Sequence, residues 1–244
     1  MFLPFLLLIS QDVAAEPPRF AECMDLATGD PAAGQANAVK WRGESGGALA
    51  RQCLGVAYAN QNRWDSAATA FEDAAHEAEL AKSPKVADYW VQSGNAWLAA
   101  GNPARARAAF DAALATASLT GLALGEAHLD RSRALVAAGD MEGARNDIDK
   151  ALVDAATDPL AWLLSATLAR REGDLKRASA DIKEALRRSP DDVSVQFEAG
   201  NIAASAGDEA NARTAWGRVI ELSPGSPVAA SARKALEQFG ATEK

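Results

Sequence analysis

Apolar residues recur at spacings of three and four along most of this 244-residue chain, which is the period of an amphipathic helix. The pattern is clearest over residues 159–192, where two such stretches are separated by Gly173 and Asp174 and the second ends before Pro190. Glycine favours the tight turn that ends a helix, and proline cannot continue one. This segment therefore predicts two amphipathic helices joined by a short turn.

The same hairpin pattern recurs at intervals of 39, 38, 34 and 34 residues, measured between its turn residues. The turn residues are Asn62, Gly101, Gly139, Gly173 and Gly207. Seven positions before each turn lies a small residue: Gly55, Gly94, Ser132, Ala166 and Gly200. Nine positions after each turn lies a large apolar residue: Phe71, Phe110, Ile148, Ile182 and Trp216. The two longer intervals predict about one extra helical turn in the second helices or connections of the first two hairpins.

These repeated positions resemble the tetratricopeptide repeat family, whose 34-residue helix-turn-helix unit has a small-residue and aromatic signature of this kind. The resemblance covers residues 48–225 with five units, and Ser132 stands where the family usually has glycine. It implies an all-α fold, a right-handed superhelical solenoid of about five hairpins. Such units stack to share one core and leave a concave surface lined mostly by the first helix of each pair.

The repeats are flanked by segments that suit the ends of such an array. Residues 16–47 predict a degenerate helical hairpin, in which Asp30 caps a helix that has Pro31 in its first turn. Residues 226–244 predict a capping helix and a short tail. Both end segments would cover apolar surface that a terminal repeat otherwise exposes.

Residues 1–15 resemble a secretory signal peptide, with an apolar run followed by Val13, Ala14 and Ala15. We expect cleavage between Ala15 and Glu16, although no lysine or arginine precedes the apolar run. That run is far shorter than the roughly 20 residues that span a bilayer, so no stable membrane anchor is expected. The chain is therefore predicted to be an exported bacterial protein, periplasmic or secreted.

The chain has only two cysteines, Cys23 in the N-terminal hairpin and Cys53 in the first helix of the first repeat. Folding the hairpin back onto this repeat would bring the two helices side by side. In the oxidising compartment that export implies, we expect a disulfide between them. The alternative is a pair of buried free thiols, which cysteine tolerates well.

Charge and motifs exclude several classes of function. The net charge of −8 lacks the cationic field that nucleic-acid binding requires. The two histidines, His76 and His128, have no metal-ligand spacing, and the glycines of residues 43–47 do not form a phosphate-binding loop. We therefore expect no catalysis, no cofactor and no nucleic-acid partner.

The resemblance places function on the first helices, where helical spacing predicts a set of polar side chains that face inward. These partner-binding candidates are Gln52, Asp88, Asn95, Asp130, Arg133, Thr167, Arg170 and Asn201. For each of them the alternative is an ordinary solvated side chain. The leading hypothesis is a scaffold of the cell envelope that binds a polypeptide in this groove. The alternative is a lipid- or glycan-binding helical module, or an accessory subunit, in envelope assembly.

Overall fold

The computed structural model describes residues 17–241, which fold into thirteen α-helices without a strand. The expected signal peptide, residues 1–15, lies outside this range. The helices are α1 Pro18–Gly29, α2 Pro31–Gly43, α3 Gly47–Asn60, α4 Trp64–Leu80, α5 Val86–Ala99, α6 Pro103–Ala115, α7 Gly121–Ala137, α8 Met141–Asp154, α9 Pro159–Glu172, α10 Leu175–Arg188, α11 Val193–Ser205, α12 Glu209–Leu222 and α13 Pro227–Ala241. Within residues 17–241 no helix has the length and apolarity needed to cross a bilayer.

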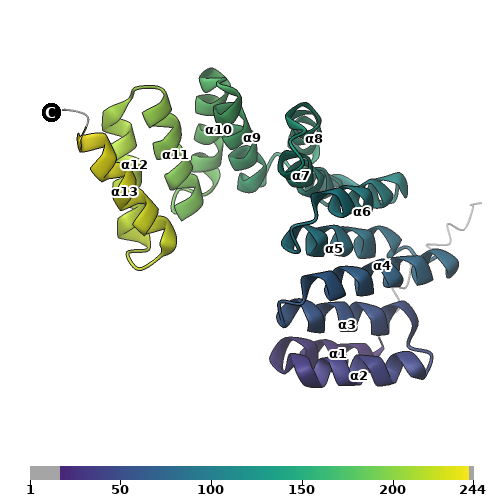
Figure 1. Ribbon diagram of the computed structural model, residues 1–244. Helices are drawn as coiled ribbons and strands as arrows, with labels where there is room; N and C mark the ends of the chain where they lie inside the picture. Colours follow the sequence, from purple (N-terminus) through teal and green to yellow (C-terminus); the bar gives the residue numbers. More distant parts are fainter. Residues whose placement is uncertain (1–16, 242–244) are drawn as a thin grey trace, which may run out of the picture.

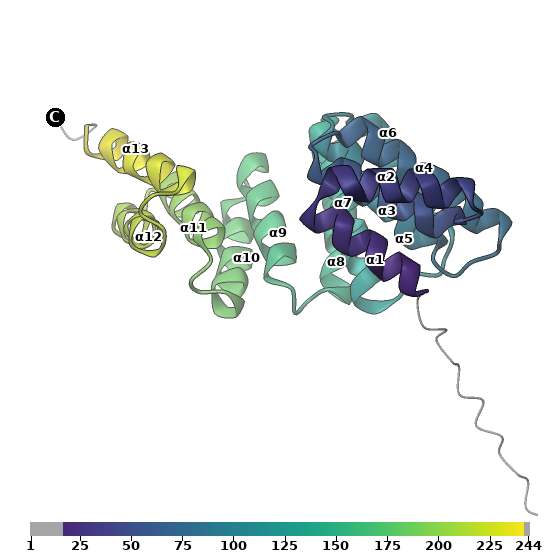
Figure 2. The same ribbon diagram turned by 90° about the horizontal axis from the view of Figure 1, so that it is seen from below.

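Successive helices pair as hairpins, and each hairpin packs on the next (Figure 1). Helices α1–α6 form one stack, α9–α13 form another, and the array turns at α7 and α8 between them (Figures 1 and 2). The all-α solenoid predicted from the repeats is thus confirmed, with the α1–α2 hairpin at one end and α13 at the other. At the C-terminal end the rings of Trp216 and Phe239 meet edge to face, with centroids 5.5 Å apart.

Local chemistry explains where the hairpins turn. All five turn residues have positive φ, from 58° at Asn62 to 83° at Gly139, a region that glycine enters without strain and asparagine tolerates. An aspartate or asparagine then caps most of the helices that follow, and its side-chain oxygen accepts a hydrogen bond from a backbone N–H of the first turn. These caps are Asn102, Asp140, Asp174 and Asp208. Asp30, Asp158 and Asp192 cap α2, α9 and α11 in the same way.

The extra residues of the first two intervals lie in different places. In the first hairpin they lengthen the second helix, α4, to 17 residues, compared with 14 in α10. In the second hairpin the second helix, α6, has only 13 residues. There the extra residues lie in the connection over 116–120 and in α7, which has 17 residues and is the first helix of the next hairpin. The expectation of a longer second helix or connection holds for both hairpins, but it omits the longer α7.

Each hairpin closes where a small residue of the first helix meets a large residue of the second. A Cβ atom added to Gly55 would lie 2.5 Å from the ring of Phe71, and one added to Gly94 would lie 2.6 Å from Phe110. The third glycine of this kind, Gly200, faces Trp216 at 2.4 Å. Real Cβ atoms do not come this close to other atoms, so these crossings require glycine.

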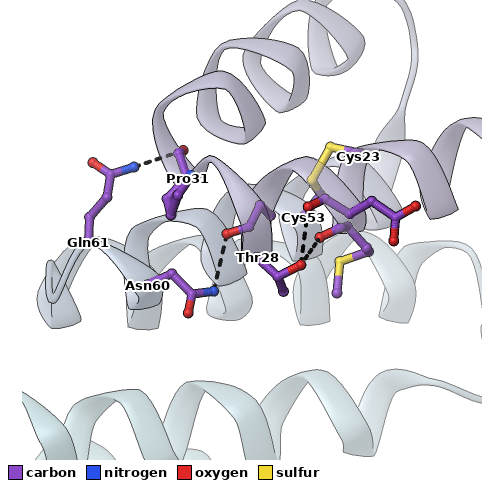
Figure 3. The surroundings of a disulfide bond; sticks show 9 residues. Cys23, Thr28, Pro31, Cys53, Asn60 and Gln61 are labelled. Carbon is purple, nitrogen blue, oxygen red and sulfur yellow. Dashed lines mark hydrogen bonds between the residues drawn. A yellow bond between two sulfur atoms is a disulfide. The ribbon is translucent and has the colours of Figure 1, made fainter.

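A disulfide joins Cys23 of α1 to Cys53 of α3, with a Cα–Cα distance of 6.1 Å, and confirms the predicted bond (Figure 3). Both cysteines are fully buried. Near the C-terminal end of α3, the Asn60 side chain donates to the Ala27 carbonyl at 3.2 Å, and Gln61 donates to the Pro31 carbonyl at 3.0 Å (Figure 3). The N-terminal hairpin is therefore attached to the first repeat at two places along α3.

Candidate functional site

The first helices of the five repeats, α3, α5, α7, α9 and α11, are here called the first-helix row. All eight partner-binding candidates lie on it: Gln52 on α3, Asp88 and Asn95 on α5, Asp130 and Arg133 on α7, Thr167 and Arg170 on α9, and Asn201 on α11. Their side chains, however, differ in how far they are already occupied by contacts within the protein. This difference decides which of them remain available to a partner.

Polar bridges connect neighbouring helices in the N-terminal part of the row. Gln52 of α3 donates to the side-chain oxygen of Gln92 on α5 at 3.3 Å. Asn95 of α5 donates to Asp130 of α7 at 2.7 Å, and Arg133 donates to the same carboxylate at 3.1 Å. Asn95 and Asp130 thus hold α5 and α7 together, and their amide and carboxylate groups are partly satisfied before any partner arrives.

A second bridge connects the C-terminal part of the row. Arg170 of α9 donates to the Glu198 carboxylate of α11 at 2.7 Å and 3.3 Å, and Glu198 is only 7% exposed. Asn201 donates to the same carboxylate at 3.1 Å and accepts from the Trp216 indole at 3.2 Å. A buried carboxylate needs such charged and hydrogen-bonding partners. Arg170 and Asn201 therefore support the fold, whatever else they bind.

The row has a gap in these bridges between α7 and α9. No hydrogen bond or ion pair is found between side chains of these two helices, both of which lie within the described residues. Instead a cleft of about 180 Å³ opens between them. It is lined by Ser132, Arg133 and Val136 of α7, Ile148 of α8, and Leu164, Thr167, Leu168 and Arg171 of α9. We call this the α7–α9 cleft.

The α7–α9 cleft combines apolar walls with two guanidinium groups. Ile148 and Leu168 are each only 2% exposed and close its interior, while Val136 and Leu164 are half-buried. Arg133 is half-exposed and bound on one side to Asp130. Arg171 is exposed and takes part in no ion pair within residues 17–241. Such a site can hold an apolar group beside an anionic one.

The sequence analysis selected some of the residues that line this cleft. It selected Arg133 and Thr167, which line the cleft, and Asp88, which is exposed and makes no side-chain hydrogen bond in the described part of the chain. It missed Arg171, because the inward phase of α9 was set on Thr167 and Arg170. Besides Thr167, α9 lines the cleft with the neighbouring stripe of Leu164, Leu168 and Arg171, whose spacings of four and three are visible in the sequence.

A separate charged cluster lies where α7 and α8 meet. Arg131 donates two hydrogen bonds to the Asp147 carboxylate, at 2.6 Å and 2.7 Å, and His128 lies 3.1 Å from it. Burial of Asp147 opposes its ionisation, but the hydrogen bonds from Arg131 and His128 outweigh burial and lower its pKa to about 2. The hydrogen bond to Asp147 likewise raises the pKa of Arg131. This carboxylate stays ionised at neutral pH and acts as an anchor between helices.

Nothing in residues 17–241 resembles a metal centre, because no group of three or more histidine, cysteine, aspartate or glutamate side chains converges there. His76 is exposed, and its ring meets Trp90 edge to face, with centroids 4.9 Å apart.

Comparisons with known proteins agree with this architecture. A family model described as a tetratricopeptide repeat matches residues 54–119 and 163–227, which together exceed half of the chain. A comparison with curated proteins finds no match.

Several solved structures share the fold at low sequence identity. PilW, described as a widely conserved type IV pilus biogenesis factor, is 20% identical with a TM-score of 0.72, over 87% of this chain and 96% of that one. PilF of Pseudomonas aeruginosa is 14% identical with a TM-score of 0.66, over 89% and 97%. YrrB, described as a repeat protein with an unusual peptide-binding site, is 18% identical with a TM-score of 0.56, over 80% and 96%. At these identities the likeness concerns the fold.

Proposed function

Because this chain belongs to the tetratricopeptide repeat family, we propose that it is a non-catalytic protein-interaction scaffold of the cell envelope. Its first-helix row binds a polypeptide partner. Repeat arrays of this kind expose a long surface made of successive helices, which suits an extended segment or a helix of another protein.

The observation that carries the proposal is the α7–α9 cleft. Every other neighbouring pair in the first-helix row is closed by a side-chain bridge, through Gln52, Asn95 or Arg170. Between the described residues of α7 and α9 there is no such bridge, and the cleft there places apolar side chains beside Arg133 and Arg171, whose guanidinium groups have free hydrogen-bonding capacity. Ordinary cores are closely packed, so an open apolar site in the middle of the array supports a role in binding.

The Cys23–Cys53 disulfide supports the envelope location. Disulfides persist in oxidising compartments such as the periplasm and are rare in the cytosol of mesophiles. The expected signal peptide at residues 1–15 agrees with this location. PilW, a type IV pilus biogenesis factor, and YrrB, which has a peptide-binding site, are examples of what the fold can do.

Capture of the partner tests this proposal. The full chain would be expressed with its own N-terminus and a C-terminal affinity tag in the cells that produce it. After cross-linking in the envelope fraction, mass spectrometry should identify a stoichiometric polypeptide. The mature protein should begin at Glu16. Co-purification of a lipid or a glycan without any polypeptide would contradict the scaffold and favour the alternative module.

A matched control separates specific capture from adhesion to a charged surface. Arg187 is 65% exposed in its side chain, and its ion pair is with Glu184 of its own helix. The variant Arg187→Glu should capture the same partner at the same yield. A protein that remains in the cytosol with Met1 intact would refute the envelope location.

A further inference from the structure

We propose that the α7–α9 cleft receives one apolar side chain of an acidic partner segment, with a neighbouring carboxylate of that segment bound by Arg171 and Arg133. This inference rests on the proposed scaffold function and names the chemistry of its partner. It is carried by the size, the lining and the charge of the cleft.

The size selects a side chain over a larger ligand. Sites for small molecules are typically about 300–1,000 Å³, whereas the α7–α9 cleft measures about 180 Å³. A cavity of about 150 Å³ in another protein is known to hold benzene. The cleft therefore has room for one leucine, methionine or phenylalanine side chain, and a lipid chain or a sugar chain would not fit inside it.

The lining favours an apolar occupant. Val136, Ile148, Leu164 and Leu168 form the walls from three different helices. The hydroxyl of Ser132 is occupied because it donates to the Leu129 carbonyl of its own helix at 2.6 Å. Water in the cleft has few polar partners, and its displacement by an apolar side chain is favourable.

The charge favours a carboxylate next to that side chain. The arginines of the adjacent helices already have acidic partners: Arg131 has Asp147, Arg145 has Glu172, Arg170 has Glu198 and Arg177 has Asp149. Arg171 is the exception, since it has no carboxylate within the described residues and stands beside the cleft in a chain of net charge −8. A guanidinium forms its strongest contacts with carboxylates, often through two parallel hydrogen bonds.

The first test is selection of a library of random 12-residue peptides, displayed on phage, against the purified disulfide-bonded protein. Enriched peptides should share an aliphatic or aromatic residue within two positions of aspartate or glutamate. Enrichment of basic peptides, of peptides without an apolar residue, or of no peptide at all would overturn the inference.

The second test locates the binding of a selected peptide, made synthetically with a fluorescein label and measured by fluorescence anisotropy. Arg171→Glu and the cleft-filling variant Thr167→Phe should each weaken binding at least about tenfold, whereas Arg187→Glu should leave it within about twofold. Replacing the apolar anchor of the peptide by serine should also weaken it about tenfold, and this change does not touch the fold of the protein.

The outcomes separate the two proposals. If Arg171→Glu and the serine peptide both bind as tightly as the originals, the cleft is not the site and the inference fails. Capture of a polypeptide from the envelope by the Arg171→Glu protein at unchanged yield would overturn the inference and leave the scaffold function standing. Circular dichroism should show the same helical content for all three variants, so that a loss of binding reports the site.

Discussion

At each helix crossing, a small residue of the first helix meets a large residue of the second helix, which lies sixteen positions later in the chain, and the sizes of the two residues are matched. Where the first helix has glycine, the second helix supplies an aromatic ring, as in Gly94 and Phe110. Where the first helix has Ser132, the residue sixteen positions on is Ile148, which lacks a ring. The space released by removing a Cβ atom is thus filled by the larger partner, which keeps the density of the core uniform along the array.

The glycine of the second repeat tests this size match. In Gly94→Ala, the new Cβ would stand 2.6 Å from the Phe110 ring. We expect a loss of about 1–3 kcal/mol in the free energy of unfolding from overpacking, despite the better helix propensity of alanine. Combining it with Phe110→Ile should recover part of this loss, because the smaller side chain makes room. Urea unfolding of the four proteins in a double-mutant cycle measures the coupling.

A matched control for this cycle is Gly217→Ala. Gly217 lies inside α12 with nothing within 4 Å of its added Cβ. There the substitution should stabilise by up to about 1 kcal/mol through helix propensity alone. If Gly94→Ala and Gly217→Ala changed the free energy of unfolding equally, the helix crossing at Gly94 would not require glycine.

The buried carboxylate of Asp147 predicts a specific pH dependence. Its pKa is lowered from an ordinary 3.8 to about 2, so the folded state binds its proton less readily than the unfolded state. The resulting stability is present above about pH 4 and is lost as the pH falls toward 2. Urea unfolding of the wild type and Asp147→Asn from pH 5.5 to 2.5 should show the difference between their free energies of unfolding narrowing by about 1.6 kcal/mol.

The other carboxylates of the chain also titrate in this range, so the comparison needs a reference variant. Asp191 is 67% exposed in its side chain and pairs with Arg218. The difference in the free energy of unfolding between Asp191→Asn and the wild type should be small at every pH, because exposed ion pairs contribute little to stability. If the difference in the free energy of unfolding between Asp147→Asn and the wild type were also independent of pH, the ionised Asp147 carboxylate would not be stabilised by the fold.

At the scale of elements, the disulfide fastens the end hairpin to the array. It closes a loop of 30 residues between α1 and α3. In the chain-entropy model such a link stabilises by about 3.5 kcal/mol. The remaining contacts between the hairpin and α3 are a buried apolar cluster that includes Phe20, Trp41 and Leu54, and the hydrogen bonds of Asn60 and Gln61. The α1–α2 hairpin should therefore depend on the bond more than any other element does.

Hydrogen exchange of the oxidised and the reduced protein tests this dependence. After reduction, the amides of α1 and α2 should exchange about a hundredfold or more faster, given a loss of roughly 3 kcal/mol. The amides of α11 and α12, at the far end of the array, serve as an internal control and should change little. Uniform acceleration along the chain would show instead that the array unfolds as a single unit.

At the scale of the molecule, the sequence predicted each hairpin better than the way in which the hairpins pack on one another. Glycine turns, aspartate caps and the small-to-large spacing are local signals, and they placed the five repeats and both ends. The bridge from Asn95 to Asp130 joins residues 35 positions apart, and it depends on how far one hairpin is shifted along the next. The same holds for the α7–α9 cleft, because its lining comes from three helices that lie where the array turns (Figure 1). Helical phase alone could select Arg133 and Thr167 but could not show that Asn95 and Arg170 are already occupied.

The junction between the two stacks has different chemistry on its two sides. On the α7 side lies the open cleft. On the α8 side, Arg145 donates to the Ser165 hydroxyl at 2.9 Å and to the Ser165 carbonyl and the Glu172 carboxylate of α9, each at 3.2 Å. Arg177 of α10 also pairs with Asp149 of α8. Guanidinium groups therefore add polar contacts to the buried apolar cluster, including Ile148, Ala161 and Leu168, that attaches α8 to the C-terminal stack.

This asymmetry predicts that Arg145 couples the two stacks. Stability in a repeat array is approximately the sum of each repeat and its interfaces with neighbours, so weakening one interface should let the parts on either side unfold separately. Arg145→Met keeps the aliphatic stem but removes the hydrogen bonds to Ser165 and Glu172. We expect a loss of roughly 1–3 kcal/mol and a broader urea transition. Hydrogen exchange should then show α9–α13 opening at a lower free energy than α1–α8.

The control Arg218→Met removes two exposed ion pairs within the C-terminal stack, with Asp191 and Glu221, whose side chains are 67% and 68% exposed. This change should lower the free energy of unfolding by less than about 1 kcal/mol and should not broaden the urea transition. A transition of Arg145→Met that shifts without broadening, with equal exchange in both stacks, would mean that apolar contacts alone hold the junction.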